Sequence, residues 1–93
     1  MSDVVRRYIV CYDICHPKRL RRIHRIVCDY AIRVQFSVYE AELTLKKLNV
    51  LVKALTNEMD YLEDSVIIFR GHTGGVELNF GRASRFKNGL LLF

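Results

Sequence analysis

The order in which strand-like and helix-like hydrophobic patterns alternate constrains the fold of this chain more than any other feature. Residues 8–12 form a continuous apolar run, which predicts a central strand buried on both faces. Apolar residues then recur at helical spacing over 18–30, with Pro17 as the first helical residue. Polar and apolar residues alternate strictly over 33–38, which predicts a strand with one face on a core. A further strand is expected over 39–43, after a very tight turn or bulge.

The second half of the chain continues with another helix and another strand. Thr44 is a suitable N-cap for a helix whose apolar stripe runs over 45–59. Asp64 and Ser65 then precede an apolar strand over 66–70. The resulting order, β-α-β-β-α-β, is the ferredoxin-like arrangement of the α+β class. We expect both helices to cover one face of an antiparallel sheet.

Residues 71–93 extend beyond this arrangement. A glycine-rich connection leads to 76–80, which predicts an additional C-terminal strand, and residues 90–93 are again apolar. A chain of 93 residues allows one domain, so we expect 1–93 to form a single ferredoxin-like domain with 71–93 as a C-terminal strand extension. Because the core sheet is complete without it, the extension can pair with the edge of a second copy or within its own chain. We favour pairing across a homodimer.

The composition argues against a disordered or a membrane protein. Of the 93 residues, 51% are hydrophobic and 27% are charged, and no apolar run approaches the ~18 residues that a membrane-spanning helix needs. The N-terminal sequence has no signal-peptide layout. Cys11, Cys15 and Cys28 lack paired spacing, which favours buried reduced thiols over a disulfide framework or a zinc site with His16 or His24. We therefore expect a cytoplasmic protein with no membrane partner.

Positive charge is concentrated in the first predicted helix. The net charge is +5 at pH 7, and residues 16–25 contain no acidic side chain. The cations of this helix are Lys18, Arg19, Arg21, Arg22 and Arg25. Such a run is often a solvated helix face, but these cations crowd the helix N-terminus, where the macrodipole disfavours them, and no acidic residue relieves their repulsion before Asp29. An uncompensated conflict of this kind indicates an external anion, and we expect the phosphate backbone of RNA or DNA.

Asp13 directly follows the first apolar run, at the C-terminal end of a central strand. An aspartate at such a junction is often only a turn residue. The functional alternative is an oxygen ligand for Mg²⁺, or Mn²⁺, because such ions are commonly held by one or two carboxylates plus phosphate oxygens. A metal there can activate water and neutralise the charge of a phosphodiester. His16 and His24 are possible general acids or bases, but such residues are more often plain surface histidines, and their role stays open.

Several of these residues recur together in one protein family. The shared features are Tyr12-Asp13 at the first strand end, the Arg-rich helix, the string Arg33-Val34-Gln35-Phe36-Ser37-Val38-Tyr39-Glu40 and Asp64-Ser65-Val66. In this order and spacing, over about residues 6–70, the chain resembles the CRISPR-associated endoribonucleases known as CRISPR-associated protein two. These are the smaller of the two universal spacer-acquisition proteins.

The resemblance implies a ferredoxin-like homodimer whose C-terminal strands cross to the partner's sheet. It implies that Asp13 from two copies holds a divalent metal across the dimer axis and that Tyr12 belongs to the catalytic site. The family's functional arginines match Arg21, Arg22 and Arg33. Members are described as metal-dependent nucleases on single-stranded RNA or double-stranded DNA. They also bridge two dimers of the larger CRISPR integrase subunit during spacer insertion.

The sequence therefore predicts a CRISPR adaptation protein. We expect a Mg²⁺-dependent endonuclease with Asp13 and Tyr12 as catalytic residues, a DNA-binding scaffold of the spacer integrase, or both. A non-catalytic nucleic-acid-binding homodimer is one alternative. A toxin ribonuclease resembling the virulence-associated VapD proteins is another. RNA and duplex DNA stay open as substrates.

Overall fold

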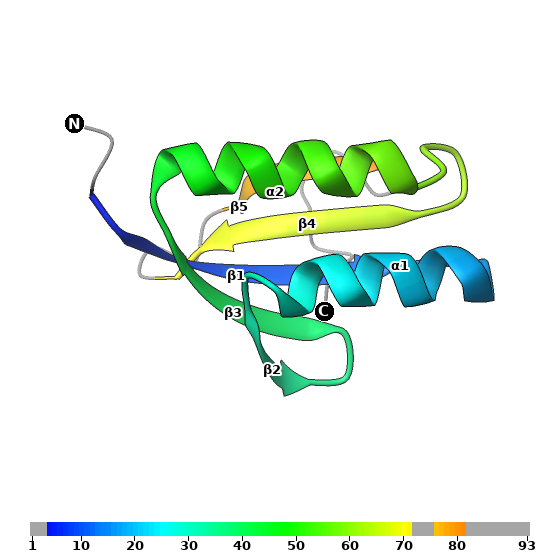
Figure 1. Ribbon diagram of the computed structural model, residues 1–93, viewed down its shortest axis with the longest axis horizontal. Coiled ribbons are helices and arrows are strands. Elements are labelled where there is room, and N and C mark those ends of the chain that lie inside the picture. Colours follow the sequence, from blue (N-terminus) through cyan, green and yellow to red (C-terminus); the bar gives the residue numbers. More distant parts are fainter. Residues whose placement is uncertain (1–3, 72–75, 82–93) are drawn as a thin grey trace.

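The computed structural model describes residues 4–71 and 76–81. Its elements are β1 (Arg6–Asp13), α1 (Pro17–Cys28), β2 (Ile32–Gln35), β3 (Val38–Leu43), α2 (Leu45–Glu58), β4 (Ser65–Arg70) and β5 (Val76–Gly81). The expected β-α-β-β-α-β order and the additional strand are confirmed (Figure 1). Among the described residues, no helix is both long and apolar enough to cross a membrane.

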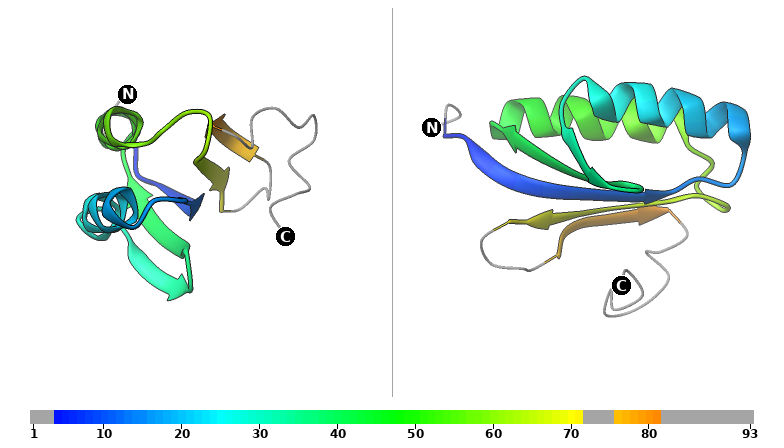
Figure 2. Two further views of the ribbon diagram at one scale, coloured as in Figure 1. Left: turned by 90° about the vertical axis from the view of Figure 1, so that its right-hand side faces the viewer. Right: turned by 90° about the horizontal axis from the view of Figure 1, so that it is seen from below.

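All strands belong to one antiparallel sheet in the order β2-β3-β1-β4-β5, and both helices lie on the same face of it (Figure 2). β1 is central and pairs with β3 on one side and with β4 on the other. Its last residue, Asp13, lies opposite Ser65, the first residue of β4. The end of β1 and the beginning of β4 therefore meet at one edge of the molecule, next to the beginning of α1.

The hydrophobic core lies between the sheet and the two helices. Its fully buried members include Val10, Ile23, Val27, Leu51, Leu55, Val66 and Ile68. On β1, Tyr8, Val10 and Tyr12 point into this core, whereas Ile9 and Cys11 on the opposite face are only half-buried. The prediction that β1 is buried on both faces is therefore wrong for the single chain, because the helices cover only one face.

Local side-chain hydrogen bonds set the beginning of both helices. At α1, the ring of His16 accepts a hydrogen bond from the N–H of Lys18 at 3.1 Å, and Pro17 follows as the first helical residue. At α2, the hydroxyl oxygen of Thr44 accepts from the N–H of Lys47 at 3.2 Å. The N-cap predicted at Thr44 is confirmed, and one role of His16 is that of a cap.

The β2–β3 hairpin differs from its prediction. The chain turns at Phe36 and Ser37, where Phe36 has a positive φ of 43°, so the alternating segment 33–38 is not one strand. Nor does β2 place one face on a core, since the exposed fractions of Ile32 and Val34 are 78% and 60%. The physical reason is position, because β2 is the edge strand of the sheet and lies beyond the face that the helices cover.

The C-terminal strand pairs within the chain. β5 adds to the free edge of β4, with Ile67 opposite Asn79. This is the intrachain alternative for residues 76–81, while exchange of the extension between two copies stays a prediction. The apolar segment 90–93 lies outside the described residues.

Candidate functional site

The side chains of Tyr12 and Asp13 point to opposite faces of the sheet. Successive residues of a strand alternate between faces, and Tyr12 belongs to the helix-side core, with an exposed fraction of 8%. Asp13 is exposed and lies on the helix-free face, beside Ser65. The two residues expected to form one catalytic site are therefore separated by the pleat of β1.

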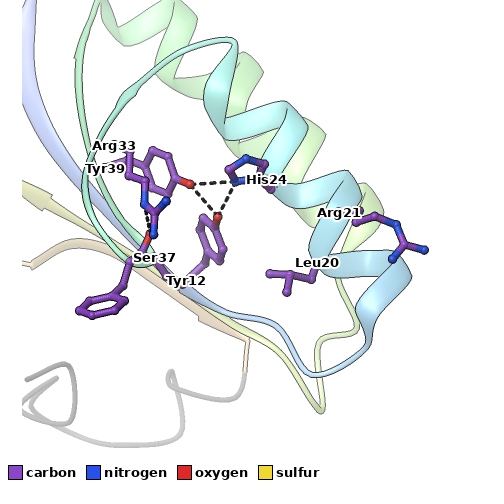
Figure 3. Close-up of a pocket in the computed structure, with 8 residues that line it drawn as sticks. Tyr12, Leu20, Arg21, His24, Arg33, Ser37 and Tyr39 are labelled. Atoms are coloured by element: carbon purple, nitrogen blue, oxygen red, sulfur yellow. Dashed lines mark hydrogen bonds between the residues drawn. The ribbon is translucent and has the colours of Figure 1, made fainter.

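On the helix side, Tyr12 takes part in a hydroxyl–imidazole cluster with His24 and Tyr39 (Figure 3). The hydroxyl of Tyr12 donates to that of Tyr39 at 3.1 Å, and the Tyr39 oxygen lies 2.8 Å from Nδ1 of His24. Nε2 of the same ring lies 3.5 Å from the Sγ atom of Cys28, on the outer side of α1.

This cluster makes the Tyr12 phenol a weaker acid. Burial raises the pKa of the Tyr12 phenol far above its usual value, and the hydrogen bond to Tyr39 raises it further. The phenol therefore stays neutral near pH 7 and acts as a donor. The hydrogen-bonded cluster links the end of β1 to α1 through Tyr12. A catalytic role for Tyr12 stays a prediction. The contact between Tyr12 and Tyr39 could not be predicted from the sequence, because it depends on strand pairing rather than on spacing along the chain.

The cluster forms the floor of a pocket of about 420 Å³ between α1 and the β2–β3 hairpin. Its lining residues are Tyr12, Leu20, Arg21, His24, Arg33, Phe36, Ser37 and Tyr39. Arg33 donates from Nε to the carbonyl oxygen of Phe36 at 3.0 Å, so its guanidinium is held at the hairpin turn. Three predicted site residues thus meet here, namely Tyr12, Arg21 and Arg33, whereas Asp13 does not line this pocket.

The cations of α1 divide into two groups. Lys18, Arg21 and Arg25 are exposed, and the structure records no ion pair for them within residues 4–71. Arg22 is also exposed and lies 3.7 Å from Glu58 of α2, a long surface contact that contributes little. The fifth cation, Arg19, lies against the protein itself.

Arg19 binds two acidic residues of the α2–β4 connection. Its Nε donates to Oδ2 of Asp64 at 2.8 Å, and its Nη2 lies 2.9 Å from Oε1 of Glu63. The expectation that the helix has no acidic partner is therefore wrong at Arg19, because the partners come from a distant part of the chain. As a predicted nucleic-acid contact, Arg19 remains untested.

Asp64 has the most enclosed carboxylate among the described residues, with an exposed fraction of 0%. Burial alone would raise its pKa, but hydrogen bonds from Arg19 and from the N–H groups of Asp60 and Cys15 outweigh burial and hold that pKa below its usual range. The sequence marked Asp64 only as part of the family resemblance. Its partners are the first indication of what it does.

Acid is expected to weaken the fold through Asp64. A lowered folded-state pKa stabilises the protein above the ordinary aspartate pKa of about 4, and this contribution is lost as pH falls through the folded value. Replacing Asp64 by Asn should therefore lower the free energy of unfolding by about 3 kcal/mol at pH 7, since one partner of a buried pair is lost. The difference in the free energy of unfolding between wild type and variant, measured by urea unfolding, should become smaller towards pH 2. A difference that is the same at pH 7 and pH 2 would contradict this assignment.

Asp13 is the residue at which the sequence predicts a divalent metal. Within them, no group of three or more His, Cys, Asp or Glu side chains is close enough to hold a metal ion. The exposed carboxylate of Asp13 suits a hard ion that takes its other ligands from phosphate oxygens, water or a second copy. The cysteines are free thiols, and Cys15 and Cys28 are exposed, so the predicted burial is wrong for these two.

Comparisons with known proteins agree with this architecture. The family described as "CRISPR associated protein Cas2" matches residues 6–75. The chain is 34% identical over 79 residues to the CRISPR-associated endoribonuclease Cas2 2 of Nitrosomonas europaea, with 85% of the chain and 70% of the relative covered.

Two solved structures resemble the fold. A hypothetical protein from Thermus thermophilus has a TM-score of 0.70 at 27% identity, with 82% of the chain and 99% of that protein covered. A crystal structure of Cas2 has a TM-score of 0.66 at 28% identity, with 84% of the chain and 77% of that protein covered. The family match spans β1 to β4 completely, and this chain therefore belongs to the family of CRISPR-associated protein Cas2.

Proposed function

We propose that this protein is a metal-dependent endonuclease of CRISPR adaptation that cleaves RNA or duplex DNA. The observation that carries the proposal is the exposed carboxylate of Asp13 at the rigid end of the central strand, just before the cationic helix α1. The relatives' description as CRISPR-associated endoribonucleases supports the reaction class. The free thiols of the chain suit the reducing cytoplasm, where we place the protein.

In this proposal Asp13 is the protein's ligand to Mg²⁺ or Mn²⁺. A metal bound there would activate water and neutralise charge on the scissile phosphate. The exposed cations of α1 hold the nucleic-acid backbone through contacts that do not depend on sequence. Tyr12 takes part from the opposite face, by fixing the strand end that carries Asp13.

A homodimer would complete the site. The helix-free face around Asp13 carries the half-buried side chains of Ile9, Cys11 and Val38, and such an apolar face is suited to packing against a second copy. A two-fold arrangement on this face would bring two Asp13 carboxylates together. We propose that this shared pair of carboxylates binds the metal.

Removal of divalent metal is expected to abolish cleavage. Wild-type protein should cut a single-stranded RNA or a DNA duplex in the presence of Mg²⁺ or Mn²⁺. Excess EDTA should reduce the rate to background, because the proposed reaction needs the ion to activate water and to neutralise charge on the phosphate. The measurement is a time course on end-labelled substrates, with metal added back after chelation. Cleavage that continues in EDTA would contradict the proposal.

A second function is supported by the exposed cations Lys18, Arg21 and Arg25. They suit a DNA-binding scaffold that works beside the larger CRISPR integrase subunit, with or without cleavage. A toxin ribonuclease is distinguished by growth arrest on expression that is relieved when Asp13 is replaced by Asn.

A further inference from the structure

One buried carboxylate joins three segments at the edge of the molecule where the proposed site lies. Oδ1 of Asp64 accepts from the N–H of Cys15 at 2.9 Å, and Oδ2 accepts from the N–H of Asp60 at 2.8 Å. Arg19 adds a charge-assisted hydrogen bond from Nε to Oδ2 at 2.8 Å, and its Nη2 lies 3.3 Å from Oδ1. We call Asp64, Arg19 and the N–H groups of Cys15 and Asp60 the Asp64 cluster.

The cluster fixes the two parts of the proposed site relative to each other. Cys15 comes two residues after Asp13, in the connection between β1 and α1. Arg19 lies in the first turn of α1, between the exposed cations Lys18 and Arg21. Asp64 itself comes immediately before Ser65, which pairs with Asp13 across the sheet. A single carboxylate is thus hydrogen-bonded to the connection beside Asp13 and to the helix that carries the cations.

We propose that Asp64 is a positioning residue for the nuclease site, which holds Asp13 and the cationic face of α1 in one fixed arrangement. This inference rests on the proposed function of Asp13. It also reassigns Arg19, which belongs to the Asp64 cluster and not to the nucleic-acid surface.

The contacts of Arg19 support the reassignment. Its side chain has an exposed fraction of 20%, against 62% for Arg22 on the same helix. Two of its nitrogens, Nε and Nη2, are engaged by Asp64 and Glu63. A phosphate that drew Arg19 away from Asp64 would leave that carboxylate buried without its cationic partner, which is costly.

The test compares Asp64→Asn and Arg19→Gln with Glu63→Gln. The last is the matched control, because it removes the exposed acidic partner of Arg19 and leaves Asp64 intact. Each protein is assayed well below its unfolding temperature for kcat and KM of Mg²⁺-dependent cleavage. The salt dependence of nucleic-acid binding and the hydrogen-exchange rate of the 13–16 segment are measured in parallel.

We expect Asp64→Asn and Arg19→Gln to lower kcat about tenfold to a hundredfold, because small displacements of reacting groups are this costly. KM should stay within about twofold of wild type, since no phosphate contact is removed. The same holds for the salt slope, by which we mean the slope of the logarithm of the binding constant against the logarithm of the salt concentration. Exchange in the 13–16 segment should become at least about tenfold faster in both variants. The Glu63→Gln protein should resemble wild type in all of these measurements.

The two proposals fail in different ways. If Asp13→Asn cleaves as fast as wild type, the nuclease proposal fails, and the exchange rates of the 13–16 segment then decide whether the Asp64 cluster holds this connection. If Asp13→Asn is inactive but Asp64→Asn keeps wild-type kcat, the positioning role alone is wrong. A lower salt slope in Arg19→Gln would mean that Arg19 contacts the nucleic acid, and it would overturn the reassignment of this residue.

Discussion

Cleavage of RNA and of duplex DNA is expected to fall at least about a hundredfold when Asp13 is replaced by Asn, because the amide cannot supply the charge that binds a divalent metal. Asp13 is exposed at the end of β1, and asparagine has nearly the same shape as aspartate. The measurement is the single-turnover rate at saturating Mg²⁺, with folding checked by thermal unfolding.

The matched control for this experiment is Asp29→Asn. Asp29 is also exposed, but it lies at the C-terminal end of α1, away from the end of β1. Its replacement should leave the rate within about twofold of wild type, as surface substitutions commonly do. Equal cleavage by wild type and Asp13→Asn would refute the proposed metal ligand or reveal a contaminating nuclease. Loss of cleavage with spacer integration intact would separate the scaffold function from the nuclease function.

Reversing two charges on α1 is expected to have the second large effect. The double variant Arg21→Glu/Arg22→Glu should weaken binding to a DNA duplex at least about tenfold near 0.15 M salt and should lower the salt slope by about 2, since each lost phosphate contact changes the slope by about 0.9. The side chains of both residues are exposed, and among the described residues the only ion pair lost is the long contact from Arg22 to Glu58. Fluorescence anisotropy across a salt series measures both quantities.

Lys46→Glu/Lys47→Glu provides a control with the same change in net charge. These lysines are exposed in the first turn of α2, so their reversal changes the charge of the whole protein without touching α1. If the nucleic acid binds along α1, this control should keep a salt slope close to that of wild type. Equal losses in both double variants would mean that net charge alone governs binding, and an unchanged Arg21→Glu/Arg22→Glu protein would refute the α1 interface.

The sequence predicted the order of the elements because each element depends mostly on its own residues. The Thr44 cap, the Pro17 start of α1 and the central position of β1 all follow from local patterns. The exposure of β2 did not follow, because alternation indicates which residues share a face but not whether another element covers that face. Val34 belongs to the alternating segment and still reaches solvent at the sheet edge.

The candidate site was predictable in part, and its errors have a common cause. The exposure of Arg21 and Arg25 on α1 agrees with the cationic helix that the sequence predicts. The acidic partners of Arg19 were missed because they lie 44 and 45 residues away in sequence. The contact between Tyr12 and Tyr39 was missed for the same reason, since it depends on the register of β1 with β3.

Because Tyr12 and Asp13 point to opposite faces of β1, the site depends more on the number of residues in this strand than on the identity of its other residues. Substitutions at Ile9 or Cys11 change one side chain and leave the others on their faces. A single-residue deletion within β1 that shifted its pairing by one position would instead send the carboxylate of Asp13 towards the core and the Tyr12 phenol onto the open face. Natural variants of this protein should therefore tolerate exchanges in β1 far better than insertions or deletions there.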